Sequence, residues 1–153
     1  MTRSNAPPGV TTTLNTLLAD NFVAYFKVHT YHFNVQGTTF AQDHTLLNEI
    51  YDFLWDSHDT FGEVIRQLDD LPCQSLKEIL QETCLKEVTT PKIRQTDIFN
   101  DVANDIASLM DVAQGLYNIS SDCGACQTVV GDYMVALSKL HWKVKATIGR
   151  SIK

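Results

Sequence analysis

Apolar side chains recur every three and four residues along four long segments of this chain, a spacing typical of amphipathic helices. The first segment follows Thr11 to Thr13, which we expect to cap a helix, and the second follows Thr39-Phe40-Ala41-Gln42, which has the form of a capping box. No segment shows the sustained polar–apolar alternation of a strand. We therefore expect an all-α chain. Its long helices should run from Leu14 to near Gly37, from Phe40 to about Asp70, and from a cap at Thr96 to a break at Ser120 to Gly124. A fourth helix after this break should carry the apolar residues from Val130 to Ile148.

The lengths of the connections predict how these helices are arranged. The outer links are short, whereas the middle connection is long enough to cross the bundle. It contains a second capping box, Ser75-Leu76-Lys77-Glu78, which predicts a short helix through about Cys84 and then a loop at 86–95. This order is typical of a ferritin-like four-helix bundle with a short extra helix in the middle crossover connection. We expect residues 1–10 to form a flexible N-terminal arm and residues 11–150 to form a single domain.

Composition and charge limit the class of partner. With 153 residues, of which 44% are hydrophobic, the chain suits one domain with a core of ordinary size. No apolar run approaches the length of a membrane span, and residues 1–13 lack the apolar region of a signal peptide, so a cytoplasmic protein is expected. The net charge of −6 argues against a general nucleic-acid binder, so DNA binding should be weak or absent.

Basic side chains gather at the C-terminal end. From Tyr133 to Lys153 there are five basic residues and no acidic one. They suit either a helix whose cations complement its C-terminal dipole and pair with acidic neighbours, or a binding patch. We favour the first interpretation.

Four cysteines lie at positions 73, 84, 123 and 126, and in a cytosolic chain we expect them to be reduced. Cys123-Gly-Ala-Cys126 has the spacing of a redox motif or a zinc knuckle. A closed zinc site needs a second convergent pair, and Cys73 and Cys84 are too far apart in sequence to resemble one. The alternative to a redox or zinc motif is that residues 123–126 form an ordinary loop and helix start that tolerates small residues.

The candidate metal ligands are His32, His44, Asp59 and Glu63. Two imidazoles and two carboxylates are the donors of an iron site with open positions. Asp59 and Glu63 are four residues apart on one helix, so their carboxylates share a face. His44 lies fifteen residues earlier, which is roughly 22 Å along the axis, so it cannot meet Asp59 within one straight helix.

A two-fold axis across the middle of this helix removes the difficulty. An antiparallel partner helix would bring His44 of one chain to Asp59 and Glu63 of the other, and symmetry would make two equivalent sites per dimer. His32 can join His44 across the short link. Each of these residues alone is more often a core histidine or a solvated acid, but all four at these spacings favour a site. No Glu is followed three residues later by His, so the di-iron pattern within one chain is not supported.

The specific motif is Tyr31-His32-Phe33-Asn34-Val35-x-Gly37-x-x-Phe40, then His44, then Asp59-x-x-x-Glu63-x-x-Arg66. With this motif the chain resembles the Dps family of mini-ferritins (DNA-binding proteins from starved cells) over nearly its whole length. The resemblance implies a hollow homo-oligomeric shell of twelve subunits that oxidises Fe(II), preferably with hydrogen peroxide rather than O2, and stores ferric mineral against oxidative damage. It also implies that the ferroxidase ligands are His32 and His44 of one chain with Asp59 and Glu63 of its neighbour.

The chain departs from the family pattern at two positions near these ligands. The family usually has an Asp four residues after the second histidine, where this chain has Asn48. A neutral amide is a weaker ligand, so we expect the second iron position to bind weakly. The tryptophan that usually follows the first histidine is Phe33, so the oxidisable aromatic beside the metals would be Tyr31 or Trp55.

Further candidates are less specific. His29 and His58 lie near the ligands in sequence and are possible extra nitrogen donors. The family's ion pores are lined with acids near the start of the last helix, where Asp122 and Asp132 are the candidates. Two rival functions stay open: a DNA-compacting protein with a weak or vestigial metal site, and a purely structural helical oligomer.

Overall fold

The computed structural model describes residues 6–150, and within them it contains five helices and no strand. The helices are α1 (Val10–Asn34), α2 (Phe40–Gln67), α3 (Leu76–Glu82), α4 (Gln95–Ile119) and α5 (Gly124–Thr147). The β-type pairing in this part of the chain is an isolated bridge between Gln36 and Arg94. The all-α prediction is therefore confirmed.

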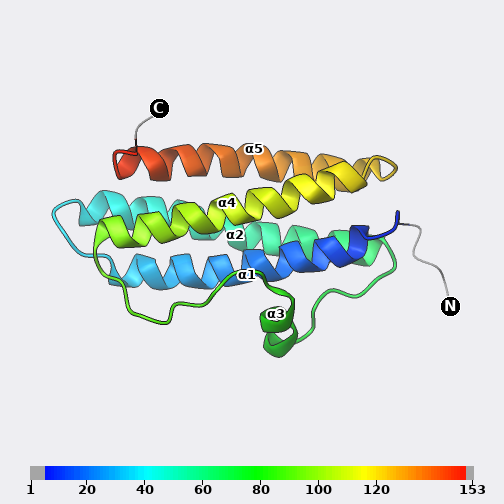
Figure 1. Cartoon of the computed structure of the whole chain (residues 1–153), viewed down its shortest axis with the longest axis horizontal. Coiled ribbons are helices and arrows are strands. Elements are labelled where there is room, and N and C mark those ends of the chain that lie inside the picture. Colours follow the sequence, from blue (N-terminus) through cyan, green and yellow to red (C-terminus); the bar gives the residue numbers. More distant parts are fainter. Residues whose placement is uncertain (1–5, 151–153) are drawn as a thin grey trace.

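The four long helices lie side by side as two antiparallel pairs, α1 with α2 and α4 with α5 (Figure 1). α2 and α4 run in the same direction, because the crossover between them returns from one end of the bundle to the other. The short helix α3 lies on this crossover and contacts α1 (Figure 1). This is the ferritin-like topology predicted from the connection lengths.

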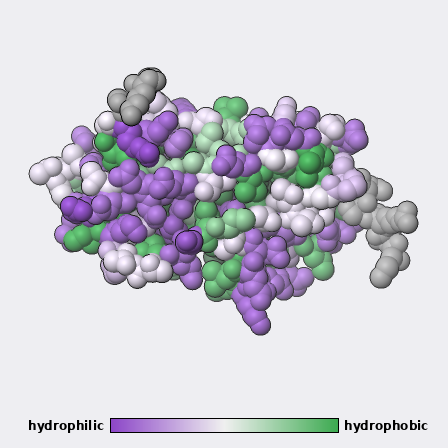
Figure 2. All heavy atoms as spheres, in the orientation of Figure 1, coloured by the Kyte–Doolittle hydropathy of each residue, from purple (hydrophilic) through white to green (hydrophobic). Residues whose placement is uncertain are grey.

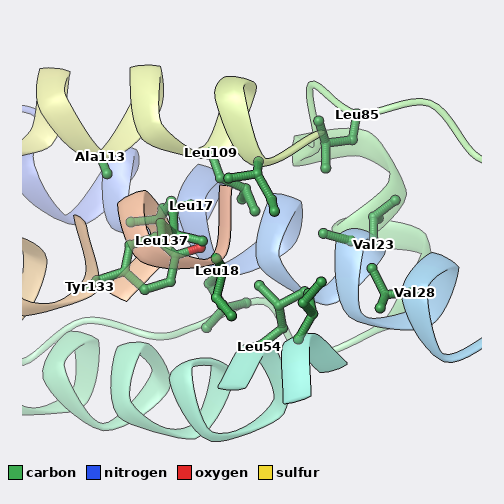
Figure 3. Packing of buried hydrophobic residues seen from close by; sticks show 14 of the residues in the cluster. Leu17, Leu18, Val23, Val28, Leu54, Leu85, Leu109, Ala113, Tyr133 and Leu137 are labelled. Atoms are coloured by element: carbon green, nitrogen blue, oxygen red, sulfur yellow. The ribbon is translucent and has the colours of Figure 1, made fainter. Parts of the chain in front are cut away.

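Side chains from all four long helices meet in one core (Figure 3). Leu17 of α1, Leu54 of α2, Leu109 of α4 and Leu137 of α5 are each fully buried, and Leu85 of the crossover packs against the same cluster. Full burial of one such side chain stabilises a fold by about 2 kcal/mol relative to exposure. The apolar stripes read from the sequence therefore face one another, and this packing holds the helices at their observed positions.

α1 begins earlier than the threonines predicted. Gly9 is the N-cap, with φ at 82°, and Val10 is the first helical residue and fully buried. The threonines therefore lie inside the helix, and the prediction that they cap it is wrong. Glycine adopts this left-handed backbone without steric cost, which lets the chain turn directly into a helix anchored by Val10. Residues 1–5 of the expected arm lie outside the described residues.

The start of α2 does not form the predicted capping box. The hydroxyl of Thr39 donates to the carboxylate of Asp43 at 2.7 Å instead of accepting from the helix backbone. The amide of Gln95 donates to the same carboxylate at 2.9 Å and also to the Thr39 hydroxyl. The buried carboxylate of Asp43 is the stronger acceptor, so it joins the start of α2 to the start of α4.

The other two predicted caps had opposite outcomes. α4 begins at Gln95 with Arg94 as its N-cap, so the prediction of a cap at Thr96 is wrong. In the predicted Ser75 capping box, the bond made by the serine side chain is confirmed, since Ser75 Oγ accepts from the backbone N–H of Glu78 at 3.1 Å. The Glu78 carboxylate accepts from the N–H of Gln74, one residue earlier than the motif requires.

A buried polar cluster ties α1 to α4. Lys27 Nζ lies 3.0 Å from Asp101 and 2.6 Å from Asp105, and the hydroxyl of Tyr31 donates to Asp101. The Lys27–Asp105 contact is an ion pair between two buried side chains. Burial raises the pKa of Asp105 to about 6, although Lys27 opposes that shift. Burial also acts on Asp101, but bonds from Tyr31 and Lys27 outweigh it and leave the pKa of Asp101 below its usual value.

The prediction that all four cysteines are reduced is wrong for Cys123 and Cys126, which form a disulfide. Cys123 is the N-cap of α5 and Cys126 lies in its first turn, so the helix geometry brings their Cα atoms to 5.4 Å, within the range that a disulfide spans. Cys73 and Cys84 are free.

Most of the face seen in Figure 2 is hydrophilic, and apolar side chains reach it in separate patches, one of them beside α3. Phe26, Leu76 and Leu80 are among the exposed apolar residues, at 62%, 64% and 49%. They line a largely apolar groove of about 400 Å³ between α1, α3 and the crossover. None of the helices within residues 6–150 is both long and apolar enough to cross a membrane.

Candidate metal centre

His32 near the end of α1 and His44 near the start of α2 face each other across the short α1–α2 turn. Their ring centroids are 3.5 Å apart, with the planes inclined by 20°. The Nδ1 of each ring lies 2.8 Å from the backbone carbonyl oxygen of the other residue. A carbonyl only accepts, so both Nδ1 atoms carry the proton and donate. In the neutral rings both Nε2 lone pairs are therefore available to a metal.

Burial favours the neutral form of one of these rings. His32 is 8% exposed, and burial lowers its pKa below the usual value. The hydrogen bond to the His44 carbonyl partly opposes this effect, while the nearby rings of His44 and His29 add to it. A neutral imidazole is the form that binds a metal, so the environment of His32 favours ligation at neutral pH.

Aromatic rings surround the two histidines. Phe33 and Tyr51 make edge contacts with His32, at centroid distances of 5.9 and 5.1 Å. His29 stacks on Tyr51 at 4.1 Å, and its Nδ1 is 3.1 Å from the hydroxyl of Tyr25. Sequence reasoning missed Tyr51, which the seven-residue spacing from His44 along α2 could have indicated.

The two aromatic candidates named from the sequence lie elsewhere. Tyr31 is buried and directed toward α4, where its hydroxyl donates to Asp101. Trp55 is 53% exposed and packs on Tyr25 at 5.0 Å, so Tyr25 separates it from His29 in the row of rings. Tyr51 is accordingly the phenol with a direct ring contact to His32.

Asn48 lies one turn beyond His44, and both ends of its amide are engaged. Its oxygen accepts from the hydroxyl of Tyr51 at 2.8 Å, and its nitrogen donates to Asp52 at 2.6 Å. The carboxylate of Asp52 also raises the pKa of His32, although less than the other groups acting on that ring. Asp52 is a second residue that sequence reasoning missed. Its position eight residues after His44 is the signal that could have found it.

Asp59 and Glu63 are exposed on α2, far from the histidines along the helix axis. α2 is continuous from Phe40 to Gln67, so the separation of roughly 22 Å between His44 and Asp59 applies. Within residues 6–150, no three side chains of His, Cys, Asp or Glu converge on a point that could hold a metal ion. The structure thus pairs His32 with His44, places Asp59 and Glu63 elsewhere on the same helix, and leaves both sets incomplete.

Of the remaining candidates named from the sequence, the histidine is half-buried and the two acids are exposed. His58 is half-buried beside Phe22, at 5.2 Å between ring centroids, and burial lowers its pKa. The backbone of Leu18 partly opposes that lowering of the pKa. Asp122 and Asp132 are exposed, at the α4–α5 link and on α5.

Among the described residues of the basic C-terminal segment, Lys143 is engaged in an ion pair. Lys143 Nζ of α5 lies 2.6 Å from a carboxylate oxygen of Glu49 on α2. This agrees with the interpretation of helix cations paired with acidic neighbours. Lys153 lies outside the described residues.

Known proteins resemble this chain in both sequence and fold. The ferritin-like domain family matches residues 11–149. The DNA protection during starvation protein of Helicobacter pylori is 34% identical over 135 residues, covering 87% of this chain and 94% of that protein. The crystal structure of antigen TpF1 from Treponema pallidum superposes with a TM-score of 0.88 at 27% identity, covering 92% of this chain and 91% of that one. The crystal structure of the DPS protein of Vibrio cholerae O1 superposes with a TM-score of 0.86 at 26% identity, covering 91% of this chain and 88% of that one. That protein is described as a member of a broad superfamily of ferritin-like diiron-carboxylate proteins.

Proposed function

This chain belongs to the ferritin-like family, among its Dps proteins, and from that premise we propose that it is a ferroxidase that oxidises Fe(II) at sites shared between two chains. His32 and His44 of one chain and Asp59 and Glu63 of the neighbouring chain hold the iron. The ferric product is stored inside a homo-oligomeric shell of twelve subunits. In a cytoplasmic setting this chemistry removes both Fe(II) and peroxide, and so limits oxidative damage.

The observation that carries the proposal is the locked pair of His32 and His44. Their reciprocal bonds orient two imidazoles with both Nε2 atoms unused, although no carboxylate among residues 6–150 of the same chain converges on them. Asp59 and Glu63 form the complementary half, with two carboxylates four residues apart and no histidine partner. An antiparallel α2–α2 contact about a two-fold axis brings the histidine half of each chain to the carboxylate half of the other, which makes two equivalent sites.

The exposed apolar groove between α1, α3 and the crossover is a candidate contact surface for a partner chain. Phe26, Leu76 and Leu80 expose large apolar surfaces, and contiguous apolar surface of this kind marks an interaction site. Phe26 lies on α1 six residues before His32. A second copy that covers the groove would bury these side chains.

The chemistry of the proposed reaction belongs to the iron and its oxidant, and the protein holds and orients them. Hydrogen peroxide takes two electrons from two Fe(II) ions, and with two protons it gives two Fe(III) ions and two waters. Taking both electrons at one site avoids the release of hydroxyl radical. O2 is the alternative oxidant. Neutral imidazoles and carboxylates are ligands suited to Fe(II) and Fe(III), and three or four of them leave a position for the oxidant.

Complementation between two inactive variants tests the shared site. His44→Ala and Asp59→Ala should each lose Fe(II) oxidation, followed by absorbance after addition of peroxide under anaerobic conditions. When the two variants are unfolded together and reassembled, part of the activity should return, because some interfaces then combine an intact histidine half with an intact carboxylate half.

Matched controls are His141→Ala on α5 and Asp111→Ala on α4, which remove a histidine and an exposed acid outside the proposed site. Both should keep full activity. An absence of recovery in shells verified by mass spectrometry to contain both variants would contradict ligation between chains.

A further inference from the structure

We propose that Cys123 and Cys126 form a redox-active dithiol–disulfide site, with Cys123 as the sulfur that exchanges with external dithiols. The two cysteines are joined at the start of α5, in a Cys-Gly-Ala-Cys sequence. The proposed ferroxidase ligands lie on α1 and α2, so this site is separate from them.

The backbone holds the two sulfurs together whether or not they are bonded. Cys123 is the N-cap of α5, and its carbonyl accepts from the N–H of Gln127 at 2.9 Å, while its own N–H donates to Ser120 at 2.8 Å. The side chain of Gln127 donates in turn to the carbonyl of Tyr117 on α4. None of these bonds involves sulfur. Breaking the disulfide therefore leaves the Cα atoms near their 5.4 Å separation, ready to close again.

The two sulfurs differ in access. Cys126 is fully buried in the core, whereas Cys123 is half-buried at the helix end. An external thiolate can reach only a sulfur that solvent reaches, so attack falls on Cys123. The partial positive charge at the N-terminus of a 24-residue helix favours a thiolate there, and the first turn of α5 contains no acidic side chain.

The disulfide is poorly suited to a structural role. It closes a loop of only a few residues, and the chain-entropy stabilisation of a disulfide is smallest for short loops. The helix that it joins is already anchored by Val130, Leu137 and Val144, each fully buried. The short spacing of the two cysteines therefore favours a role in thiol–disulfide exchange over a role in stabilising the fold.

Exchange with an external dithiol would transfer two electrons to the Cys123–Cys126 disulfide. A thiolate of a dithiol reductant attacks Cys123 Sγ, the Cys123–Cys126 bond breaks, and Cys126 leaves as a thiolate that takes up a proton. The second thiol of the reductant loses its proton and attacks the reductant sulfur of the mixed disulfide, which releases Cys123 as a thiolate that is then protonated. Two electrons pass to the protein, and the reductant leaves as an internal disulfide. The reverse reaction restores the oxidised site.

The other two cysteines provide an internal comparison. Burial and the nearby Glu82 and Glu78 raise the pKa of Cys73. Asp20, followed by burial, raises the pKa of Cys84. Both thiols are therefore held in the unreactive protonated form. They can be replaced together by serine, which leaves a protein whose only cysteines are the proposed pair.

The test uses this Cys73→Ser/Cys84→Ser protein, assembled and free of iron. It is equilibrated anaerobically with mixtures of reduced and oxidised dithiothreitol, quenched in acid, alkylated and weighed by mass spectrometry. The pair should convert completely between its two states while the circular dichroism spectrum keeps its helical form. Reduction that occurs only after the protein is unfolded in urea would overturn the proposal.

Two further measurements identify the attacked sulfur. In the reduced protein, a brief pulse of iodoacetamide should label Cys123 about tenfold faster than Cys126, and this experiment needs no substitution at the site. In the same background, Cys126→Ser should form a mixed disulfide with oxidised glutathione, and Cys123→Ser should not. Equal labelling of the two sulfurs, or faster labelling of Cys126, would overturn the assignment of Cys123.

Discussion

The side chains of the candidate site depend on bonds that cross the α1–α2 turn. His32 and His44 each use Nδ1 to bind the backbone of the other residue, so moving either ring breaks both bonds. Because the second ring nitrogen is left free, this bonding orients the pair for a ligand that approaches through Nε2. Asn48 belongs to the same arrangement, since its amide holds Asp52 on one side and Tyr51 on the other.

Replacing Asn48 by aspartate should strengthen binding of the second iron and destabilise the iron-free protein. Hard Fe(II) prefers charged oxygen donors, so the second binding phase, which we expect to be weak in anaerobic calorimetry of the wild type, should become tighter in Asn48→Asp. The variant also loses the donor to Asp52 and places two carboxylates four residues apart. Together these changes should cost about 1 kcal/mol of stability.

The double variant Asn48→Asp/Asp52→Asn is the matched control, because it restores the hydrogen bond with donor and acceptor exchanged. Its thermal stability should return toward that of the wild type, while the second iron phase stays tight. If the wild type already binds two Fe(II) per site with equal affinity, the argument from Asn48 is wrong.

Asp105 should make stability depend on pH between about 4 and 6. Burial raises its pKa from 3.8 to about 6 in the folded protein, so the folded state binds a proton in this range that the unfolded state releases. The contribution is fully present below pH 3.8 and is lost as the pH rises through 6. A pKa shift of about two units corresponds to a change of about 3 kcal/mol in the free energy of unfolding.

Urea denaturation of the wild type and Asp105→Asn at several pH values and equal chain concentration measures this contribution. The stability of the wild type relative to the variant should fall as the pH rises from 4 to 7. Asp111→Asn, an exposed change on the same helix, should show no such trend. A flat difference for Asp105→Asn, or one of opposite sign, would contradict the assignment.

At the scale of the elements, the α1–α2 turn controls how the two histidines meet. Gly37 has φ at 135°, a backbone conformation that residues with a side chain rarely adopt, and an added Cβ would meet no atom within 4 Å. Gly37→Ala should therefore cost about 1–3 kcal/mol through backbone strain alone, seen as a lower melting temperature by circular dichroism.

Gly115→Ala is the matched control for Gly37→Ala. Gly115 is helical, exposed and equally uncrowded, so alanine should stabilise α4 by about 0.5–1 kcal/mol. Equal effects of the two substitutions would show that the strain at Gly37 is not the cause.

At the scale of the whole molecule, the separation of ligands along α2 implies that the smallest active unit is a dimer. Multi-angle light scattering should find an assembly of twelve chains of 17.2 kDa and no stable active monomer. A monomer that still oxidised Fe(II) would remove the basis of the shared site.

The charge of the whole chain predicts weak binding to DNA. Neutralisation of phosphates supplies most non-specific affinity, and this chain carries a net charge of −6 with Lys143 already paired to Glu49. No band shift is expected with linear duplex DNA at about 150 mM salt, a concentration at which non-specific binding is already strongly reduced. A tight complex under those conditions would point to the basic segment from Lys139 to Lys153 as the contact.

Local patterns in the sequence were enough to predict the elements and their order. Spacings of three and four place apolar residues on one face of a helix whatever surrounds it, and the long middle connection leaves few ways to arrange four such helices. The axial distance between His44 and Asp59 follows from helix geometry alone, so the incompleteness of the site within one chain was also predictable.

Only the tertiary structure decided which groups meet across elements. Asp43 takes the hydroxyl of Thr39 because Gln95 of a distant helix also reaches that carboxylate. The hydroxyl of Tyr31 donates to Asp101 on α4. The rings of His32 and His44 stack across the turn that contains Gly37. These choices depend on competition between partners far apart in sequence, since a buried polar group takes the best acceptor within reach. The sequence shows which groups compete, but packing determines which of them come within reach of one another.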